Sequence, residues 1–333
     1  MADLKSKYLG IDIKNPVVVG ASKLTSNMDR IREIENYGAG ALVCSSLFEE
    51  QVQLKNYKLD NDLQSMRVGS DAEMSRLMET DGTGGPEEHL LWLKKAKNAV
   101  KIPVIGSLNA VNEKTWIDYA IRIEDTGVDA LECNFYFVPG DTSKTADDIE
   151  NEQLKIMEKV KAAVKIPVAA KLSYFYTNPL GFIKRTEQTG IDGVVLFNRL
   201  FEPDISPENS KYIAPLNLSS QGGYKLGIRY AGLLYQNLDC DIIAGTGIFD
   251  GFDVVKLVLA GASSVQIVSA LYKLGIGHIE KILAEINQYL DENDYSDLNS
   301  IRGILSEKNI KDPFVFKRAQ YISLLLKSEK LNR

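Results

Sequence analysis

Short apolar segments alternate with longer amphipathic ones along most of the chain, and this alternation constrains the fold more than any other feature. The apolar segments are rich in Val, Ile, Leu and Ala, as expected for parallel strands buried on both faces. Eight such strand–helix units in 333 residues predict an α/β fold, a (β/α)8 TIM barrel. The strands are expected at 16–20, 41–45, 103–107, 130–134, 168–172, 193–197, 241–245 and 264–268.

Turn residues mark where the predicted helices end and strands begin. The hexapeptide Ala-Val-Lys-Ile-Pro-Val occurs at 99–104 and again at 163–168, with proline at the strand entrance, where no ladder donor is needed. Glycine precedes several strands, as at 127–130 and 190–193, which is typical of helix ends that need a left-handed residue. We see no boundary between units, and the prediction is a single domain, 1–333.

Several segments lie outside the repeating units. Residues 7–14 are predicted to form an N-terminal hairpin that covers the barrel floor. The loops 46–86 and 198–224 are long enough to be functional, and the first, which is polar, is predicted to be a mobile lid. The barrel core is expected over about 15–290, followed by a C-terminal helical extension, 291–333, packed outside it.

The composition argues against several classes of function. The net charge is −6 and no basic patch stands out, so nucleic-acid binding is not expected. No apolar run approaches the roughly 18 residues of a membrane span, and no signal peptide is visible. The two histidines, of which His89 is expected to be solvated, form no cluster with the three cysteines, so no metal site is predicted. Cysteines without a disulfide pattern favour a cytoplasmic location.

Residues 241–272 contain two turns of a kind that binds phosphate. One apolar run ends in Gly245-Thr246-Gly247, and the next ends at Ser269-Ala270. Backbone N–H groups at such turns bind phosphate, and in α/β barrels the site is often made by the loops after strands 7 and 8. The sequence therefore predicts a phosphate-bearing ligand at the carboxyl end of the barrel.

Lys171 stands out among the polar residues predicted at the same end. It follows Val-Ala-Ala inside an apolar strand, and a buried lysine needs a charge partner or a ligand. Asn134 and Asn198 end two further strands that face the same mouth. Taken by itself, Lys171 fits either a charge-stabilising role or a Schiff base in a lyase or aldolase.

The motifs and their order along the chain resemble those of the dihydroorotate dehydrogenase family, in particular its soluble class 1 branch. The resemblance spans about residues 4–290. The resemblance is carried by 15–16, 21–22, 132–134, 171–172, Asn198, 200–204, 222–223, 245–248 and 266–272. It implies an FMN-dependent oxidoreductase of pyrimidine biosynthesis that acts on a C–C bond of a small substrate.

Carried over position by position, the resemblance implies which residues hold FMN. The phosphate would lie on Gly222, Gly223, Gly245, Thr246, Gly247, Ser269 and Ala270, and the flavin ring near Ala21, Ser22, Asn134, Lys171 and Asn198. Lys171 would stabilise negative charge on the reduced flavin and raise its potential.

The positions at which the family binds and deprotonates its substrate differ in this chain. The family's catalytic Cys or Ser falls at Phe137, which cannot accept a proton, and its substrate-binding Asn falls at Pro139. Loss of a general base typically costs about 10²–10⁴-fold in rate. Either another residue is the base, with Tyr136, Lys23 and Cys44 as candidates, or the substrate is not dihydroorotate; we favour the second explanation.

A small anionic substrate is still expected, with Asn109 and Arg199 as candidates for binding it. The alternative functions are a Schiff-base lyase or aldolase that uses Lys171, and a flavin-binding protein without dihydroorotate turnover. The chain has no GxGxxG element in a strand–helix context and no cysteine cluster, so an electron acceptor or redox partner is not identified. The family resemblance also implies a possible homodimer.

Overall fold

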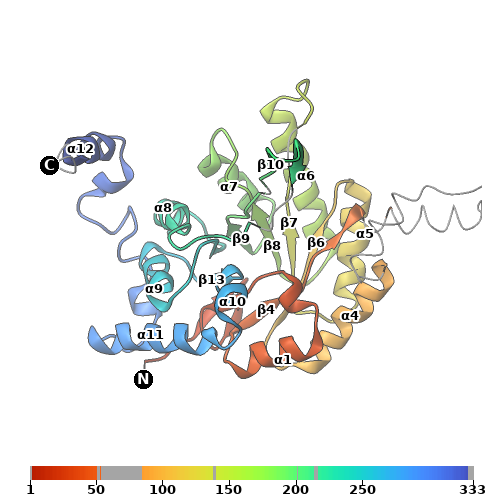
Figure 1. Ribbon diagram of the computed structural model, residues 1–333, viewed down its shortest axis with the longest axis horizontal. Helices are drawn as coiled ribbons and strands as arrows, with labels where there is room; N and C mark the ends of the chain where they lie inside the picture. Colours follow the sequence, from red (N-terminus) through yellow and green to blue (C-terminus); the bar gives the residue numbers. More distant parts are fainter. Residues whose placement is uncertain are drawn as a thin grey trace, which may run out of the picture.

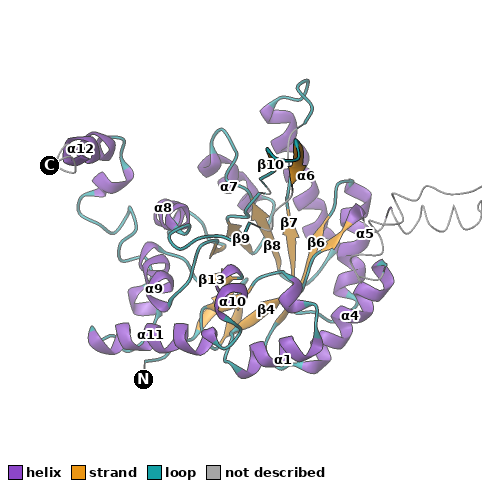
Figure 2. Ribbon diagram, viewed as in Figure 1, coloured by secondary structure: helices purple, strands orange, loops and turns teal. Residues whose placement is uncertain are grey.

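A closed barrel of eight parallel strands forms the centre of the protein, with helices around it (Figures 1 and 2). The computed structural model describes residues 2–50, 53, 85–137, 140–200, 202–213 and 217–328. The barrel strands are β3 (Val17–Val19), β4 (Ala41–Val43), β6 (Val104–Asn109), β7 (Ala130–Asn134), β8 (Val168–Leu172), β9 (Gly193–Leu196), β12 (Asp241–Gly245) and β13 (Ser264–Ile267). Each overlaps one predicted strand, so the predicted barrel is confirmed.

The barrel closes because the strands pair in a ring. The order is β4-β3-β13-β12-β9-β8-β7-β6, and β6 pairs back onto β4. The short strand β5 (Leu47–Phe48) adds to the upper part of β6, opposite Leu108 and Asn109. All pairings within the ring are parallel. The carboxyl ends of all eight strands therefore meet at one mouth, where this fold places its active sites.

Helices cover the outer surface of the barrel (Figure 2). They are α1 (Met28–Asn36), α4 (Pro86–Ala99), α5 (Glu113–Glu124), α6 (Ala146–Ala163), α7 (Pro179–Gln188), α8 (Lys225–Leu234), α9 (Gly251–Ala260) and α11 (His278–Glu292). The short helix α10 (Ser269–Leu274) lies between β13 and α11. Polar caps fix several helix starts: the Asn27 side chain accepts from two backbone N–H groups of α1, and Thr145 forms a capping box on α6.

The repeated hexapeptide has the same structural role in both copies. Each copy ends a helix, α4 or α6, and leads into a strand, β6 or β8. In the first copy, the Glu35 carboxylate accepts hydrogen bonds from two consecutive backbone N–H groups of the motif. In the second, Glu124 does the same. Each copy of the hexapeptide is therefore held by a glutamate carboxylate just before the barrel strand begins.

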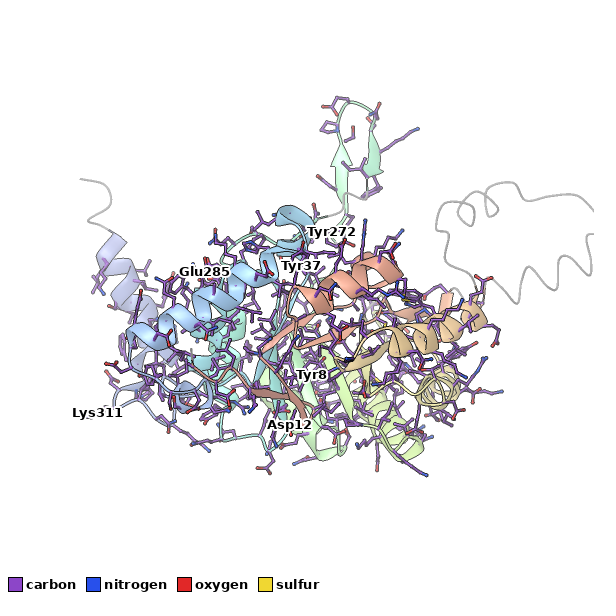
Figure 3. The ribbon with its side chains drawn as sticks, turned by 90° about the horizontal axis from the view of Figure 1, so that it is seen from below. Tyr8, Asp12, Tyr37, Tyr272, Glu285 and Lys311 are labelled. Atoms are coloured by element: carbon purple, nitrogen blue, oxygen red, sulfur yellow. The ribbon has the colours of Figure 1, made fainter. Side chains whose placement is uncertain are left out.

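The lower half of the barrel is filled with apolar side chains. The hairpin of β1 (Ser6–Tyr8) and β2 (Ile11–Ile13) closes this end, as predicted. Its Tyr8 and Leu9 pack against inward-facing residues of the strands, namely Val18, Ala41, Val43, Ile105, Ala130, Ala169, Val195 and Ile243. Seen from below, Tyr8 lies near the centre of the molecule (Figure 3). Because the floor is filled, the space for a ligand lies at the opposite end.

Two outer regions add detail that the sequence does not predict. The loop 198–224 contains a hairpin, β10 (Asp204–Ser206) with β11 (Lys211–Ile213), which stands away from the barrel (Figure 3). The C-terminal extension is only partly helical. Between α11 and α12 (Ala319–Ser328) it runs through turns whose Gly303 and Leu305 N–H groups donate to carbonyls of α9.

The predicted lid at 46–86 lies largely outside the described residues. Among those described, no helix combines the length and apolar character needed to span a bilayer.

The Nε2 atom of His89 on α4 is buried, in contrast to the solvated ring expected from the sequence. It has no hydrogen-bond partner within the described part of the chain, and burial lowers the pKa of His89 to about 4. An unfolded histidine titrates near 6.5. Between these two pH values the folded state therefore binds fewer protons than the unfolded state. The stability contributed by the neutral ring is fully present above about pH 6.5 and is lost as the pH falls towards 4.

This burial predicts a measurable acid sensitivity. When the pH is lowered from about 7 to about 5, the free energy of unfolding should fall by roughly 2 kcal/mol because of His89 alone. The His89→Leu variant should lose that part of the pH dependence in urea unfolding. A variant with the same pH dependence as the native chain would contradict the assignment.

Candidate functional site

A polar layer lies above the apolar floor and is centred on Lys171. The Lys171 Nζ atom is 2.9 Å from Gln266 Oε1 and 3.3 Å from Glu132 Oε1. Glu132 is fully buried, and the Lys171 side chain is 12% exposed. Gln266 Nε2 donates to the other oxygen of Glu132 and, at 2.9 Å, to the Tyr8 hydroxyl. One network therefore joins the floor hairpin to β7, β8 and β13.

The network explains how the barrel holds charge at its centre. A buried ion that has lost its partner is strongly destabilising, whereas pairing and additional hydrogen bonds offset its desolvation. Burial, together with the nearby Glu132, raises the pKa of Tyr8 well above its usual value, so the hydroxyl remains protonated. Lys171 uses two of its three ammonium hydrogens on protein groups that the structure describes. The third is available to a ligand at the mouth.

Asn134 and Asn198 lie side by side at the mouth. The Asn198 Nδ2 group donates to Asn134 Oδ1 at 2.7 Å, and Asn134 is opposite Lys171 in the register of β7 and β8. The three polar residues that the sequence places at separate strand ends are thus brought together.

The predicted turns after β12 and β13 meet a third segment, from the loop that precedes α8. A Cβ atom at Gly247 would lie 2.5 Å from the Cα of Gly223, so glycine is required for this approach. Ser219 links the segments: its hydroxyl accepts from the Gly247 N–H at 3.1 Å, and its own N–H donates to Ser269 Oγ at 3.0 Å. The phosphate turns therefore form one connected unit.

The turn after β12 is held in an unusual backbone conformation. Thr246 has φ +69° and Gly247 has φ +76°, and a left-handed non-glycine residue costs on the order of 1–2 kcal/mol. The Thr246 hydroxyl donates to the Phe197 carbonyl at 2.9 Å, which helps to fix the turn. Such local strain is common at ligand sites.

Two adjoining cavities connect the turns to the polar layer. The first, of about 190 Å³, is lined by Ala21, Lys171, Asn198, Arg199, Gly245, Thr246, Gly247 and Ser269, among others. The second, of about 380 Å³, shares Asn198, Arg199, Gly245 and Thr246 with the first and extends past Gly223. Most residues predicted for the phosphate and several predicted for the ring therefore surround one space. Gly222 and Ala270 do not line it, but each is next in sequence to a residue that does, Gly223 or Ser269.

Other predicted site residues do not line these cavities. The Ser22 hydroxyl donates to the Gly20 carbonyl, and Lys23 is exposed at the start of the short helix that follows. Asn109 is buried in β6, and Tyr136 is half-buried after β7. Cys44 is completely buried, and burial raises the pKa of its thiol to about 12, which does not suit a group that must accept a proton.

Arg199 is the one cation among the described residues that lines both cavities. Its guanidinium lies 3.5 Å from the Glu202 carboxylate, with the two side chains 34% and 66% exposed. Ion pairs this exposed are worth about 0–1 kcal/mol. An anionic ligand can therefore replace Glu202 at little cost.

Four residues of the site were not predicted to hold a ligand. Glu132 and Gln266 had a signal, since they lie in the motifs 132–134 and 266–272 that carry the family resemblance. Ser219 had a weaker one, as a polar residue in the loop after the sixth predicted strand, and its link to Gly247 depends on how that loop folds back. Tyr8 had none, because its contact depends on a distant hairpin.

The fold and the site together define an α/β-barrel protein with a ligand-sized space at the mouth of the barrel, and comparison with known proteins identifies its family. Residues 3–290 match the family model described as dihydroorotate dehydrogenase. The chain therefore belongs to the dihydroorotate dehydrogenase family, and it is an oxidoreductase acting on CH–CH groups. The resemblance inferred from the motifs is confirmed.

Similar curated proteins cover nearly the whole chain. The dihydroorotate dehydrogenase B (NAD(+)) catalytic subunit of Thermoplasma volcanium is 28% identical over 91% of this chain and 99% of its own. The protein of the same name in Methanocaldococcus jannaschii is 27% identical over 91% and 98%. The chloroplastic dihydropyrimidine dehydrogenase (NADP(+)) of Arabidopsis thaliana is 22% identical over 90% of this chain and 76% of its own.

Proposed function

We propose that the protein binds FMN at the barrel mouth and uses it to oxidise or reduce a C–C bond of a small anionic substrate. The observation that carries this proposal is the continuous space between the glycine turns and Lys171. Backbone N–H groups at the turns suit a phosphate. The Lys171 ammonium suits the part of a reduced flavin that carries negative charge.

The residues present fit this cofactor. Gly245 and Gly247 line the cavity at the turn after β12, and a Cβ atom at Gly247 would lie 2.5 Å from the Cα of Gly223, so the turns can meet around a phosphate only with bare backbone. Gly222, Gly223, Gly245, Thr246, Gly247, Ser269 and Ala270 would hold the phosphate end, and Ala21, Ser22, Asn134, Lys171 and Asn198 the ring. Bound FMN supplies hydride transfer. The chain orients it, and Glu132 and Gln266 hold the Lys171 nitrogen in place.

We further infer that the substrate is not dihydroorotate. The side chain at the family's base position, Phe137, is 39% exposed and has no atom that accepts a proton. Arg199 is our first candidate for binding the substrate anion, followed by Asn109. Tyr136 and Lys23 remain the candidates for proton transfer, since the burial of Cys44 disfavours it.

A Schiff-base lyase is the second candidate, and the geometry around Lys171 counts against it. The nitrogen that would attack a carbonyl is held between Glu132 and Gln266. Borohydride reduction in the presence of candidate carbonyl substrates should leave the mass of the chain unchanged.

The remaining proposals concern how the protein works in the cell. We propose that the whole chain acts as one domain in the cytoplasm and forms a homodimer. The relatives in Thermoplasma volcanium and Methanocaldococcus jannaschii are catalytic subunits of dihydroorotate dehydrogenase B (NAD(+)), which supports a separate redox partner for this chain as well.

The proposed function predicts the behaviour of the purified protein. It should be yellow and should bind about one FMN per chain, which light should reduce under anaerobic conditions. Dihydroorotate should bleach the flavin at least about 100-fold more slowly than expected for an enzyme with a base in place. A colourless protein that takes up no FMN would refute the cofactor assignment. Rapid bleaching by dihydroorotate would refute the substrate inference.

A further inference from the structure

A third cavity opens beside Phe137. It measures about 480 Å³ and lies between the first turns of α6 and the segment that leads into α7. Much of its wall is apolar, formed by Phe137, Ile149, Phe175 and Leu200. A cavity of about 150 Å³ already holds a benzene molecule, so there is room here for a substituted ring.

This cavity is a neighbour of the site described above. Phe175 and Leu200 line both it and the 380 Å³ cavity, which is also lined by Asn198 and Arg199. Arg199 and Phe137 therefore belong to adjacent cavities, on either side of Phe175 and Leu200.

Several polar side chains on the cavity wall are engaged with protein partners. The Tyr176 hydroxyl donates to Gln153 Oε1 at 2.7 Å. The Glu150 carboxylate accepts from Arg185 Nη1 at 2.8 Å. Among the described lining residues there is no cation to balance an anion, and an unpaired charge is costly to desolvate. The cavity thus suits an uncharged, apolar group.

The two neighbouring cavities therefore differ in chemistry. In one, Arg199 has only the exposed Glu202 as an ion-pair partner among the described residues, and a ligand carboxylate can take that place with a charge-assisted hydrogen bond. In the other, Phe137 and its neighbours offer an apolar wall. A two-part ligand, anionic at one end and apolar at the other, matches both.

We propose that the substrate is an unsaturated carboxylate with an apolar, ring-sized substituent. Its carboxylate binds at Arg199 and its substituent fills the cavity beside Phe137. The proposal rests on the proposed function for the reacting C–C bond. In this proposal Phe137, which stands at the position of the family's base, lines the pocket for the substituent and so contributes to substrate specificity.

The test compares two probes that share a carboxylate and a double bond but differ in the substituent. Cinnamate carries a phenyl ring, and crotonate carries a methyl group. Binding of each to the protein, with and without added FMN, is measured by calorimetry. Cinnamate should bind about tenfold or more tightly than crotonate, because only its ring is buried in the cavity.

A cavity-filling variant makes the test specific to this location. Ala146 lines the cavity at the start of α6, so Ala146→Trp should remove the advantage of cinnamate and leave crotonate binding within about twofold of the native value. Glu158→Trp is the matched control, because Glu158 is exposed on the same helix and does not line the cavity. It should leave both affinities unchanged.

The outcomes separate this proposal from the proposed function. FMN binding is followed independently by flavin fluorescence, and a protein that binds cinnamate but no FMN would refute the proposed function alone. A protein that binds FMN but binds cinnamate no better than crotonate, or binds neither probe, would overturn the substrate proposal. So would an Ala146→Trp variant that keeps the preference for cinnamate.

Discussion

The Gly247→Val variant should fold and yet lose tight FMN binding, with a Kd raised about 100-fold or more, which corresponds to roughly 2.7 kcal/mol. The reason is steric. A Cβ at Gly247 would lie 2.5–2.8 Å from three backbone atoms of Gly223, so the two turns that would hold the phosphate must move apart. The measurement is a titration of the apoprotein with FMN, followed by quenching of flavin fluorescence.

Gly127→Val provides a matched control for this variant. Gly127 also has a positive φ, +85°, but nothing in the described structure lies within 4 Å of a Cβ built there. Backbone strain should cost each variant about 1–2 kcal/mol of folding stability, and Gly247→Val should lose more because of its clash with Gly223. Only Gly247→Val should lose FMN. Equal FMN affinities in the two variants would show that the phosphate lies elsewhere.

Replacing Lys171 should have the largest effect on stability. The Lys171→Met variant leaves the fully buried Glu132 carboxylate without its cation, which typically costs about 3–5 kcal/mol. The same change removes positive charge near the proposed flavin. We therefore expect the midpoint potential of bound FMN to fall by about 30–60 mV, equivalent to roughly 1.4–2.8 kcal/mol for a two-electron couple.

The double variant Lys171→Met/Glu132→Gln separates the two effects. Neutralising residue 132 removes the unpaired charge, so most of the lost stability should return. The potential should remain low, because the cation is still absent. Chemical unfolding and a potentiometric titration measure the two quantities. A double variant whose potential returned to the native value would contradict a direct action of Lys171 on the flavin.

The barrel could be predicted from the sequence because local chemistry determines it. Strands buried on both faces are continuous apolar runs, and their ends carry proline and glycine signals, as in the two copies of Ala-Val-Lys-Ile-Pro-Val. Asn134, Lys171 and Asn198 could be placed together for the same reason, since each stands at the carboxyl end of a parallel strand.

What the sequence did not predict depends on long-range contacts. Tyr8 reaches Gln266 from a hairpin 258 residues away along the chain, and Ser219 joins the phosphate turns only because its loop folds back over them. The cavity beside Phe137 likewise has no local signature. It exists because α6, the segment before α7 and the loop after β9 leave space between them.

The central claim is that the glycine turns and Ser269 hold the phosphate of FMN, and a comparison of FMN with riboflavin tests it most directly. The two ligands share the flavin ring and differ in the phosphate. If the claim is right, titration of the apoprotein will show about one FMN bound per chain, about 100-fold or more tightly than riboflavin. Equal affinities for the two ligands, or no binding of FMN, would contradict it.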